Sequence, residues 1–381
     1  MTLPAIAPGA EHRFAPPRVT APHTDATSAV LAGGASWVPM VLSSLGDADA
    51  VQVPIIDGSV TYSQDMDAQW RLAVTVPRFA DGRDWFPGAD AEHPLARFGQ
   101  ELSASVHVTG GPVDEVFQVG TGHIQSWDLA VDGGSVSVEA LGVMMRVAEA
   151  GFAVPQAVRP GGTFGTELTR LFRYVAPLVI DDGLTDRAAP AGMAWGDDRL
   201  EAAREIEETW PCRLRTDAYG VVWALPPLGD VPEPVARLAD GEGGTVVGAP
   251  VADARAGVPN RVVVRGEAVT EDRPAVQGYA QIDSGPMSVH GPYGTVTHLY
   301  TSQLLTTRDQ CIRSANGRLK RMTARSRTIP VTCAPDPRLC VPDLAVEVIH
   351  DGRRDWGWVV GFELPLVVGS GPMRVDVEVP Y

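Results

Sequence analysis

The eight histidines are the side chains best suited to proton transfer or metal binding near neutral pH, and they are scattered along the chain. Outside the N-terminal segment, the closest pair is His290 and His298, with Asp283, Tyr293 and Tyr300 nearby in the sequence. Such a set could hold a metal ion or transfer protons. An ordinary exposed loop explains the spacing more simply, so we predict neither a catalytic residue nor a metal ligand there.

Short motifs of glycine and acidic residues are too incomplete to define a site. Residues 47–49 (Asp-Ala-Asp) and 65–67 (Asp-Met-Asp) begin like calcium-binding loops, but neither continues into the spaced acidic pattern of such a loop. Residues 120–122 (Gly-Thr-Gly) lack the third glycine of a dinucleotide-binding loop and are interpreted as a bend in a strand. The sequence has no G-x-S-x-G elbow, H-E-x-x-H pair or P-loop. We predict that the protein is not an enzyme and binds no cofactor or metal.

The four cysteines show no C-x-x-C pair and no histidine at zinc-finger spacing. They are Cys212, Cys311, Cys333 and Cys340. We interpret them as small buried hydrophobic side chains. Cys333 and Cys340 flank a proline-rich turn, so the sequence leaves open whether they form a disulfide.

The one unusual charge cluster is basic. Seven basic residues fall between positions 308 and 327: Arg308, Arg313, Arg318, Lys320, Arg321, Arg325 and Arg327. A solvated helix face and a contact with an acidic neighbouring subunit both explain them, and binding of nucleic acid is a much weaker third explanation.

Trp356 and Trp358 alternate on a predicted strand and share one face, which suits a packed interface or a sugar-binding platform. The candidate inter-subunit contacts are Arg308, Arg313, Arg318, Lys320, Arg321, Trp356 and Trp358.

The overall charge narrows the possible partners. The formal net charge of -16 opposes attraction to phosphate, although an acidic wall would let DNA slide past without sticking. With 44% hydrophobic and 20% charged residues, the chain has the composition of a soluble globular protein. It has neither a secretory signal pattern nor an apolar run long enough to span a bilayer, so we expect no membrane segment.

Alternation of apolar and polar side chains predicts a β-rich first region. Residues 1–35 are rich in proline and predict an arm outside the core. Alternation follows from Trp37 onward and is clearest over residues 70–76. The dipeptide Asp57-Gly58 predicts a hairpin turn. Residues 36–150 are therefore predicted to form one antiparallel barrel or sandwich.

Helical spacing predicts a small α/β insertion over residues 151–240. Thr163 can cap one helix, and a second helix is predicted to start near Asp198. Two strands are predicted to follow, at residues 212–216 and 221–225.

Residues 241–381 are predicted to return to strands, interrupted by one long helix at 302–322. Thr307 and Gln310 are spaced as a capping box for that helix. The predicted fold class is mainly β with an α+β insertion, namely two barrel or sandwich domains with a small α/β domain between them.

Four short blocks, taken in order, resemble the hub family that caps phage tail tubes, in contractile and in flexible tails. The blocks are residues 195–223 (from Trp-Gly-Asp-Asp to Tyr-Gly-Val-Val-Trp), 259–267 (Pro-Asn-Arg-Val-Val-Val-Arg-Gly-Glu), 293–322 (Tyr-Gly and the long helix) and 334–343 (Ala-Pro-Asp-Pro-Arg-Leu-Cys-Val-Pro-Asp). In the last block Pro342 stands where the family usually has glycine.

The resemblance implies two tail-tube-like barrels per chain and a homotrimer whose six barrels match a sixfold tube. It implies a structural minor tail protein that caps the tail tube, connects it to distal tip proteins and forms a ring through which DNA passes. Expected partners are further copies of the chain, tail-tube or distal ring proteins, and tip or fibre proteins. The expected location is the tail tip of the virion, after synthesis in the host bacterial cytoplasm. A tail-associated cell-wall hydrolase and a carbohydrate-binding receptor protein stay open as alternatives.

Overall fold

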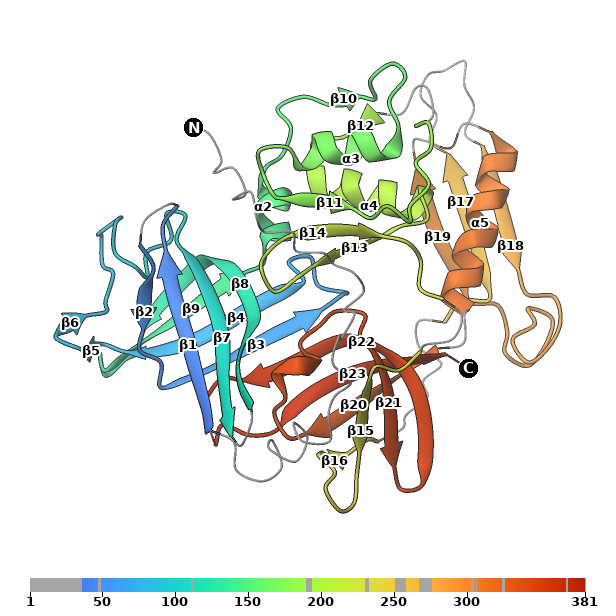
Figure 1. The fold of residues 1–381 in the computed structure, drawn as a ribbon. Helices are drawn as coiled ribbons and strands as arrows, with labels where there is room; N and C mark the ends of the chain where they lie inside the picture. Colours follow the sequence, from blue (N-terminus) through green and yellow to red (C-terminus); the bar gives the residue numbers. More distant parts are fainter. Residues whose placement is uncertain are drawn as a thin grey trace.

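The computed structural model (Figure 1) describes residues 36–46, 49–110, 113–189, 194–229, 233–250, 258–266, 276–302, 305, 307–323, 326–367 and 369–380. The predicted N-terminal arm, residues 1–35, lies outside this set, as do Asp47 and Ala48 of the first acidic motif. The fold is mainly β, as predicted, and its body is a 13-stranded sheet.

The first part of this sheet comes from the N-terminal region and is antiparallel throughout, in the order β3-β4-β9-β8-β7-β1-β2. Its strands are β1 (Ser36–Ser44), β2 (Val51–Val53), β3 (Asp57–Ser63), β4 (Trp70–Pro77), β7 (Glu101–Gly110), β8 (Val113–Leu129) and β9 (Ser135–Leu141), and β5 (Phe79–Ala80) pairs with β6 (Arg83–Asp84) in a separate hairpin. The alternation predicted for residues 70–76 is confirmed, because the apolar side chains of β4 are buried and the intervening ones are not. Their burial anchors this part of the core.

The hairpin predicted at Asp57-Gly58 is wrong. Strand β2 pairs with β1, and Asp57-Gly58 opens strand β3 and pairs with β4 instead of turning. A Cβ atom on Gly58 would lie 2.9 Å from the carbonyl oxygen of Ala73 in β4. The glycine therefore permits a close approach of two backbones, which the dipeptide alone does not distinguish from a turn.

Strands from the C-terminal region continue the same sheet. They are β15 (Ala236–Ala239), β16 (Val246–Gly248), β20 (Ser326–Cys333), β21 (Ala345–His350), β22 (Arg353–Pro365) and β23 (Met373–Pro380), with the short helix η1 (Pro337–Leu339) before β21. The two regions join where β22 pairs with β3, placing Phe362 opposite Tyr62. One hydrophobic core runs beneath both regions.

The two β-rich regions are thus not two closed barrels. The described strands form an open path with β16 at one end and β2 at the other. Strands β3 and β22, at the boundary between the regions, pair with each other rather than each closing its own half. Figure 1 shows the two sets of strands side by side, blue to teal for the first, and red with olive-yellow β15 and β16 for the second.

The α/β insertion packs as a body with its own core above the large sheet (Figure 1). Its elements are α2 (Val143–Glu149), β10 (Gln156–Ala157), α3 (Phe164–Phe172), β11 (Leu178–Ile180), β12 (Ala194–Trp195), α4 (Arg199–Thr209), β13 (Arg213–Thr216) and β14 (Val222–Leu225). The predicted cap and the predicted second helix start are confirmed: the Thr163 side chain accepts the Thr166 N–H, and helix α4 begins after Asp198, whose side chain accepts the Glu201 N–H. These bonds satisfy amides that the first helical turn leaves without a partner.

Glu167 in helix α3 is a buried carboxylate that connects several segments of this insertion by hydrogen bonds. Its side chain is 1% exposed and accepts hydrogen bonds from Trp195 Nε1 at 3.1 Å, Arg170 Nε at 3.0 Å and the Arg159 backbone N–H at 3.2 Å. Burial alone would raise the pKa of Glu167, but these hydrogen bonds outweigh it and lower the pKa below its ordinary value.

Glu167→Gln is expected to lower the free energy of unfolding by about 2–3 kcal/mol at neutral pH, because Arg170 loses its charged partner. Since the folded-state pKa is the lower one, this contribution is full above the ordinary value of 4.5 and is lost as the pH falls through the folded-state value. Urea denaturation at neutral pH and at about pH 3.5 measures both effects. The exposed Glu201→Gln is the control, and an equal loss in both variants would contradict the assignment.

A third body is a small sheet covered by the long helix. Strands β17 (Arg261–Gly266), β18 (Gln277–Gln281) and β19 (Thr297–Ser302) form it in the order β18-β17-β19, and helix α5 (Arg308–Thr323) packs on one face around a core of its own. The capping box is confirmed, because the Thr307 N–H donates to Gln310 Oε1 at 3.0 Å and the Gln310 N–H donates to Thr307 Oγ1 at 3.3 Å.

The predicted helix start at residue 302 is wrong, because residues up to Ser302 belong to strand β19. Residues 241–381, predicted as one β domain, contribute to two bodies: β17, β18, β19 and α5 form the small one, whereas β16, β20 and the strands after it join the large sheet.

Candidate functional site

The most distinctive surface of the molecule is the polar side of the large sheet, across β22, β3, β4, β9 and β8. We call it the polar face. Its side chains alternate with the buried ones along each strand and line a shallow hollow of about 470 Å³. The polar lining residues are Asp57, Ser59, Arg71, Thr75, Ser126, Asp128, Ser137, Glu139, Glu363 and Ser370. The pairing of β3 with β22 is what makes this surface continuous.

Charge on the polar face is predominantly negative. Arg71 Nε lies 2.5 Å from Glu139 Oε1, so that pair is neutral as a unit. Asp57, Asp128 and Glu363 line the same hollow, and Arg71 is the one basic residue of the described lining, while Arg374 on β23 lies opposite Glu363. Asp57 accepts hydrogen bonds from the Gly58 N–H and the Ser370 hydroxyl. The described lining has no histidine and no cysteine, and its chemistry suits repulsion of a polyanion more than acid–base catalysis.

The second notable arrangement joins the insertion to the sheet, and we call it the junction. Arg213 and Arg215 alternate on β13 and both reach the carboxylate of Asp343, with Arg215 Nε 3.0 Å from Asp343 Oδ2. The three side chains are 8–18% exposed. Gln64 also accepts a hydrogen bond from Arg215 at 3.0 Å. A carboxylate between two guanidinium groups is a strong and geometrically specific contact.

Backbone contacts complete the junction. Gln69 Nε2 donates to the Leu214 carbonyl at 2.9 Å and Gln69 Oε1 accepts the Thr216 N–H at 2.8 Å. Trp70 Nε1 donates to the Thr216 carbonyl at 2.7 Å. Strand β13 is thereby fixed against the β3–β4 hairpin. Sequence reasoning missed this role of Asp343, although two arginines two residues apart on a strand signal a shared acidic partner.

The predicted contact residues on helix α5 lie in different environments. Arg308, Arg313 and Lys320 are exposed. Arg318 is only 9% exposed: it pairs with Glu208 beside helix α4's end, with Nη1 3.1 Å from Oε1, and its guanidinium lies over the ring of Tyr300. Arg318 therefore makes its contacts with residues of its own chain. The side chain of Arg321 lies outside the described set.

The two tryptophans of β22 share one face of the sheet, as the alternation predicts. Trp356 is 44% exposed and Trp358 is half-buried. Trp356 lies opposite Glu347 on β21, and Trp358 lies between Ala345 on β21 and Glu378 on β23. The pair forms an aromatic strip on a sheet surface.

Of the residues weighed for acid–base chemistry, the structure brings His290 and Asp283 together and gives Tyr293 and Tyr300 partners outside the set. His290 lies 3.5 Å from Asp283 at the surface, while Tyr293 donates its hydroxyl to the Val258 carbonyl at 2.9 Å. Tyr300 packs under Arg318, and His298 belongs to strand β19. No acid–base constellation forms from these described side chains.

Among the described residues, one group of three possible metal ligands lies at the ends of β15 and β21. His350 Nδ1 lies 2.9 Å from Asp240, and its Nε2 lies 3.5 Å from Asp351. The imidazole thus stands between two carboxylates, and ion pairing alone accounts for this arrangement. The backbone N–H of Asp351, and then His350, lower the pKa of Asp240. We assign no metal there.

All four cysteines are free and buried, so the structure contains no Cys333–Cys340 disulfide. Burial raises the pKa of the Cys212 and Cys333 thiols to about 12. Such thiols stay protonated and unreactive near neutral pH.

In the described part of the chain, helices that are both long and apolar enough to cross a bilayer are absent.

Comparison with solved structures shows a shared fold with phage tail proteins. A tail protein from Neisseria meningitidis superposes with a TM-score of 0.59 at 13% identity, over 90% of this chain and 97% of the other. The 43 kDa tail protein of prophage MuSo2 from Shewanella oneidensis gives 0.58 at 11%, over 89% and 98%. A prophage tail protein from Listeria monocytogenes gives 0.52 at 10%, over 89% and 94%. The chain therefore has the fold of these tail proteins.

Comparison by sequence, in contrast to comparison by structure, gives no match. The chain matches no protein-family model. It also matches no curated protein.

Proposed function

We propose that the chain is a structural hub subunit that caps a phage tail tube and connects it to distal tip proteins. The observation that carries the proposal is the polar face, because it is acidic, rich in hydroxyl groups and continuous across both β-rich regions. The fold shared with tail proteins over nine-tenths of the chain supports it.

In the proposed assembly, copies of the chain form a ring, a homotrimer, whose channel is lined by the polar face. The described sheet is open at both ends, and ring closure would cover strand edges that otherwise promote aggregation. DNA would pass through the channel without being gripped, because like charges repel it. Further partners would be tail-tube or distal ring proteins and tip or fibre proteins, within the virion tail tip, after synthesis in the host bacterial cytoplasm.

The exposed residues Arg308, Arg313 and Lys320 of α5, and the Trp356–Trp358 strip, are the proposed contacts with neighbouring proteins. Basic side chains on an acidic chain favour contact with an acidic surface. Exposed aromatic side chains supply contact area at low entropic cost.

Reversing charge on the polar face tests the proposed channel. The triple variant Asp57→Lys, Asp128→Lys and Glu363→Lys changes exposed residues only, so folding and assembly should be retained. Particles carrying it are expected to release DNA at least about tenfold more slowly, because three new cations per copy would bind phosphate. Release is measured on purified particles by dye fluorescence.

The matched control reverses three exposed acidic residues elsewhere, Glu92→Lys, Asp182→Lys and Asp197→Lys. The proposal requires normal release from these particles. Equal release from wild-type and polar-face particles would show that this surface does not line the path of DNA.

The exposed Trp356 favours one alternative, a carbohydrate-binding receptor protein. Binding of cell-wall glycans that Trp356→Ala abolishes would support it. The hydrolase alternative would require turnover of cell-wall material by the purified chain.

A further inference from the structure

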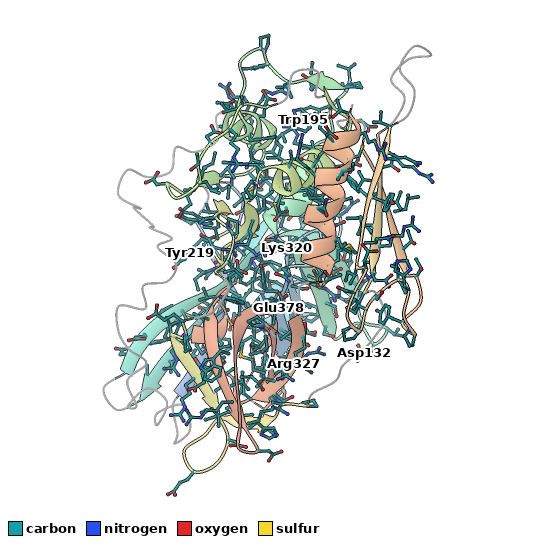
Figure 2. The ribbon with its side chains drawn as sticks, turned by 90° about the vertical axis from the view of Figure 1, so that its right-hand side faces the viewer. Asp132, Trp195, Tyr219, Lys320, Arg327 and Glu378 are labelled. Carbon is teal, nitrogen blue, oxygen red and sulfur yellow. The ribbon has the colours of Figure 1, made fainter. Side chains whose placement is uncertain are left out.

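The face of the small sheet opposite helix α5 carries a regular grid of side chains. Val263 in β17 is paired with Tyr279 in β18 and with Leu299 in β19, which sets three apolar side chains in one row. Tyr279 and Leu299 are each 51% exposed. Figure 2 shows α5 on one side of these strands and no other described element on the far side. We call this surface the grid face.

Two polar rows border the apolar one. They are Gln281, Arg261 and Thr297 on one side, and Gln277, Arg265 and Thr301 on the other. The guanidinium of Arg261 lies 4.9 Å from the centroid of the Tyr279 ring. None of the nine positions is acidic, so the grid face combines an exposed aromatic ring, aliphatic groups and arginines. Aromatic rings and arginines are enriched at protein interfaces.

The charge of the whole body identifies the class of partner. Residues 258–323 contain eight Arg or Lys and five Asp or Glu, a net of 8 − 5 = +3. The other residues therefore sum to −16 − 3 = −19. A second copy of the chain thus offers a strongly acidic surface to this basic body. Opposite potentials of this kind steer association and fix its orientation.

We infer that the grid face is a docking surface for the acidic part of a second copy of this chain. The inference rests on the proposed function, since a ring needs each copy to present two different surfaces to its neighbours. It places the main contact on the face of the small sheet opposite α5, whereas Arg308 lies at the edge of the sheet beside Gln277 and Tyr279.

The test measures mass by light scattering over a range of concentrations and salt. The wild type is expected to reach three times 40.5 kDa. Arg261→Glu combined with Arg265→Glu should raise the dissociation constant at least about tenfold. Arg97→Glu combined with Arg187→Glu is the matched control, because it makes the same charge change at two exposed arginines outside the small sheet, and it should not raise the constant.

Each outcome decides a different point. If the wild type assembles and the grid-face variant assembles equally well, the inference is overturned but the proposed ring is not. A wild type that stays monomeric at every concentration overturns both. Equal weakening by both double variants shows a general charge effect and also overturns the inference.

A labelling experiment avoids charge changes altogether. The native cysteines are buried, so an introduced surface cysteine reacts selectively with a maleimide. Leu299→Cys should react at least about tenfold more slowly in the assembled than in the dissociated protein. The fully exposed Val131→Cys should react equally in both states. Equal rates for Leu299→Cys would contradict docking at this face.

Discussion

Asp343→Asn is expected to lower the free energy of unfolding by about 3–5 kcal/mol, because it removes the carboxylate that two largely buried guanidinium groups share, and Arg215 keeps only the more distant Glu207, at 3.8 Å. Arg213 and Arg215 are 18% and 12% exposed, and both reach the same carboxylate. Arginine stays protonated at any accessible pH, so the fold cannot relieve the loss by neutralising it. The insertion should loosen from the sheet before the sheet itself unfolds.

Chemical denaturation, together with limited proteolysis, measures this effect. Asp376→Asn is the control: Asp376 pairs with Arg374 at 3.0 Å, but Arg374 is 59% exposed. Solvent screening limits that pair to about 1 kcal/mol or less. A loss below about 1 kcal/mol in Asp343→Asn would show that the junction is not a main support of the fold.

Trp70→Ala is expected to cost about 3–5 kcal/mol, the usual range for deleting a buried tryptophan. Trp70 is fully buried, and its ring lies 5.1 Å from Tyr62 and 5.5 Å from Phe362 between centroids. Phe362 comes from β22 and Thr216, which accepts the indole N–H, comes from the insertion. One side chain therefore contacts both β-rich regions and the insertion.

Trp70→Phe separates packing from hydrogen bonding. It keeps an aromatic ring but removes the donor to Thr216, so about 1–2 kcal/mol should be lost. Trp356→Ala, at an exposed position, should cost about 1 kcal/mol or less. Thermal or urea unfolding measures all three, and equal losses for Trp70→Ala and Trp356→Ala would contradict the position of Trp70 at the centre of the core.

Local signals in the sequence predicted local structure well. Thr163, Asp198 and the Thr307–Gln310 pair marked helix starts, because a cap forms with amides two or three residues away. Alternation in β4 showed which side chains are buried, since a strand has a period of two.

Long-range pairing left no comparable signal. Tyr62 and Phe362 are separated by most of the chain, and nothing near either residue specifies the other. The continuous sheet, and with it the polar face, therefore could not be predicted. Arg318 illustrates the same limit, because its position in a basic cluster gave no indication of its partner Glu208.

The most direct measurement is an electron cryomicroscopy reconstruction of the purified protein assembled at high concentration. We expect a closed ring of three copies, with β22, β3, β4, β9 and β8 facing the channel. A ring with the polar face turned outward, or a protein that never assembles, would contradict the proposed hub.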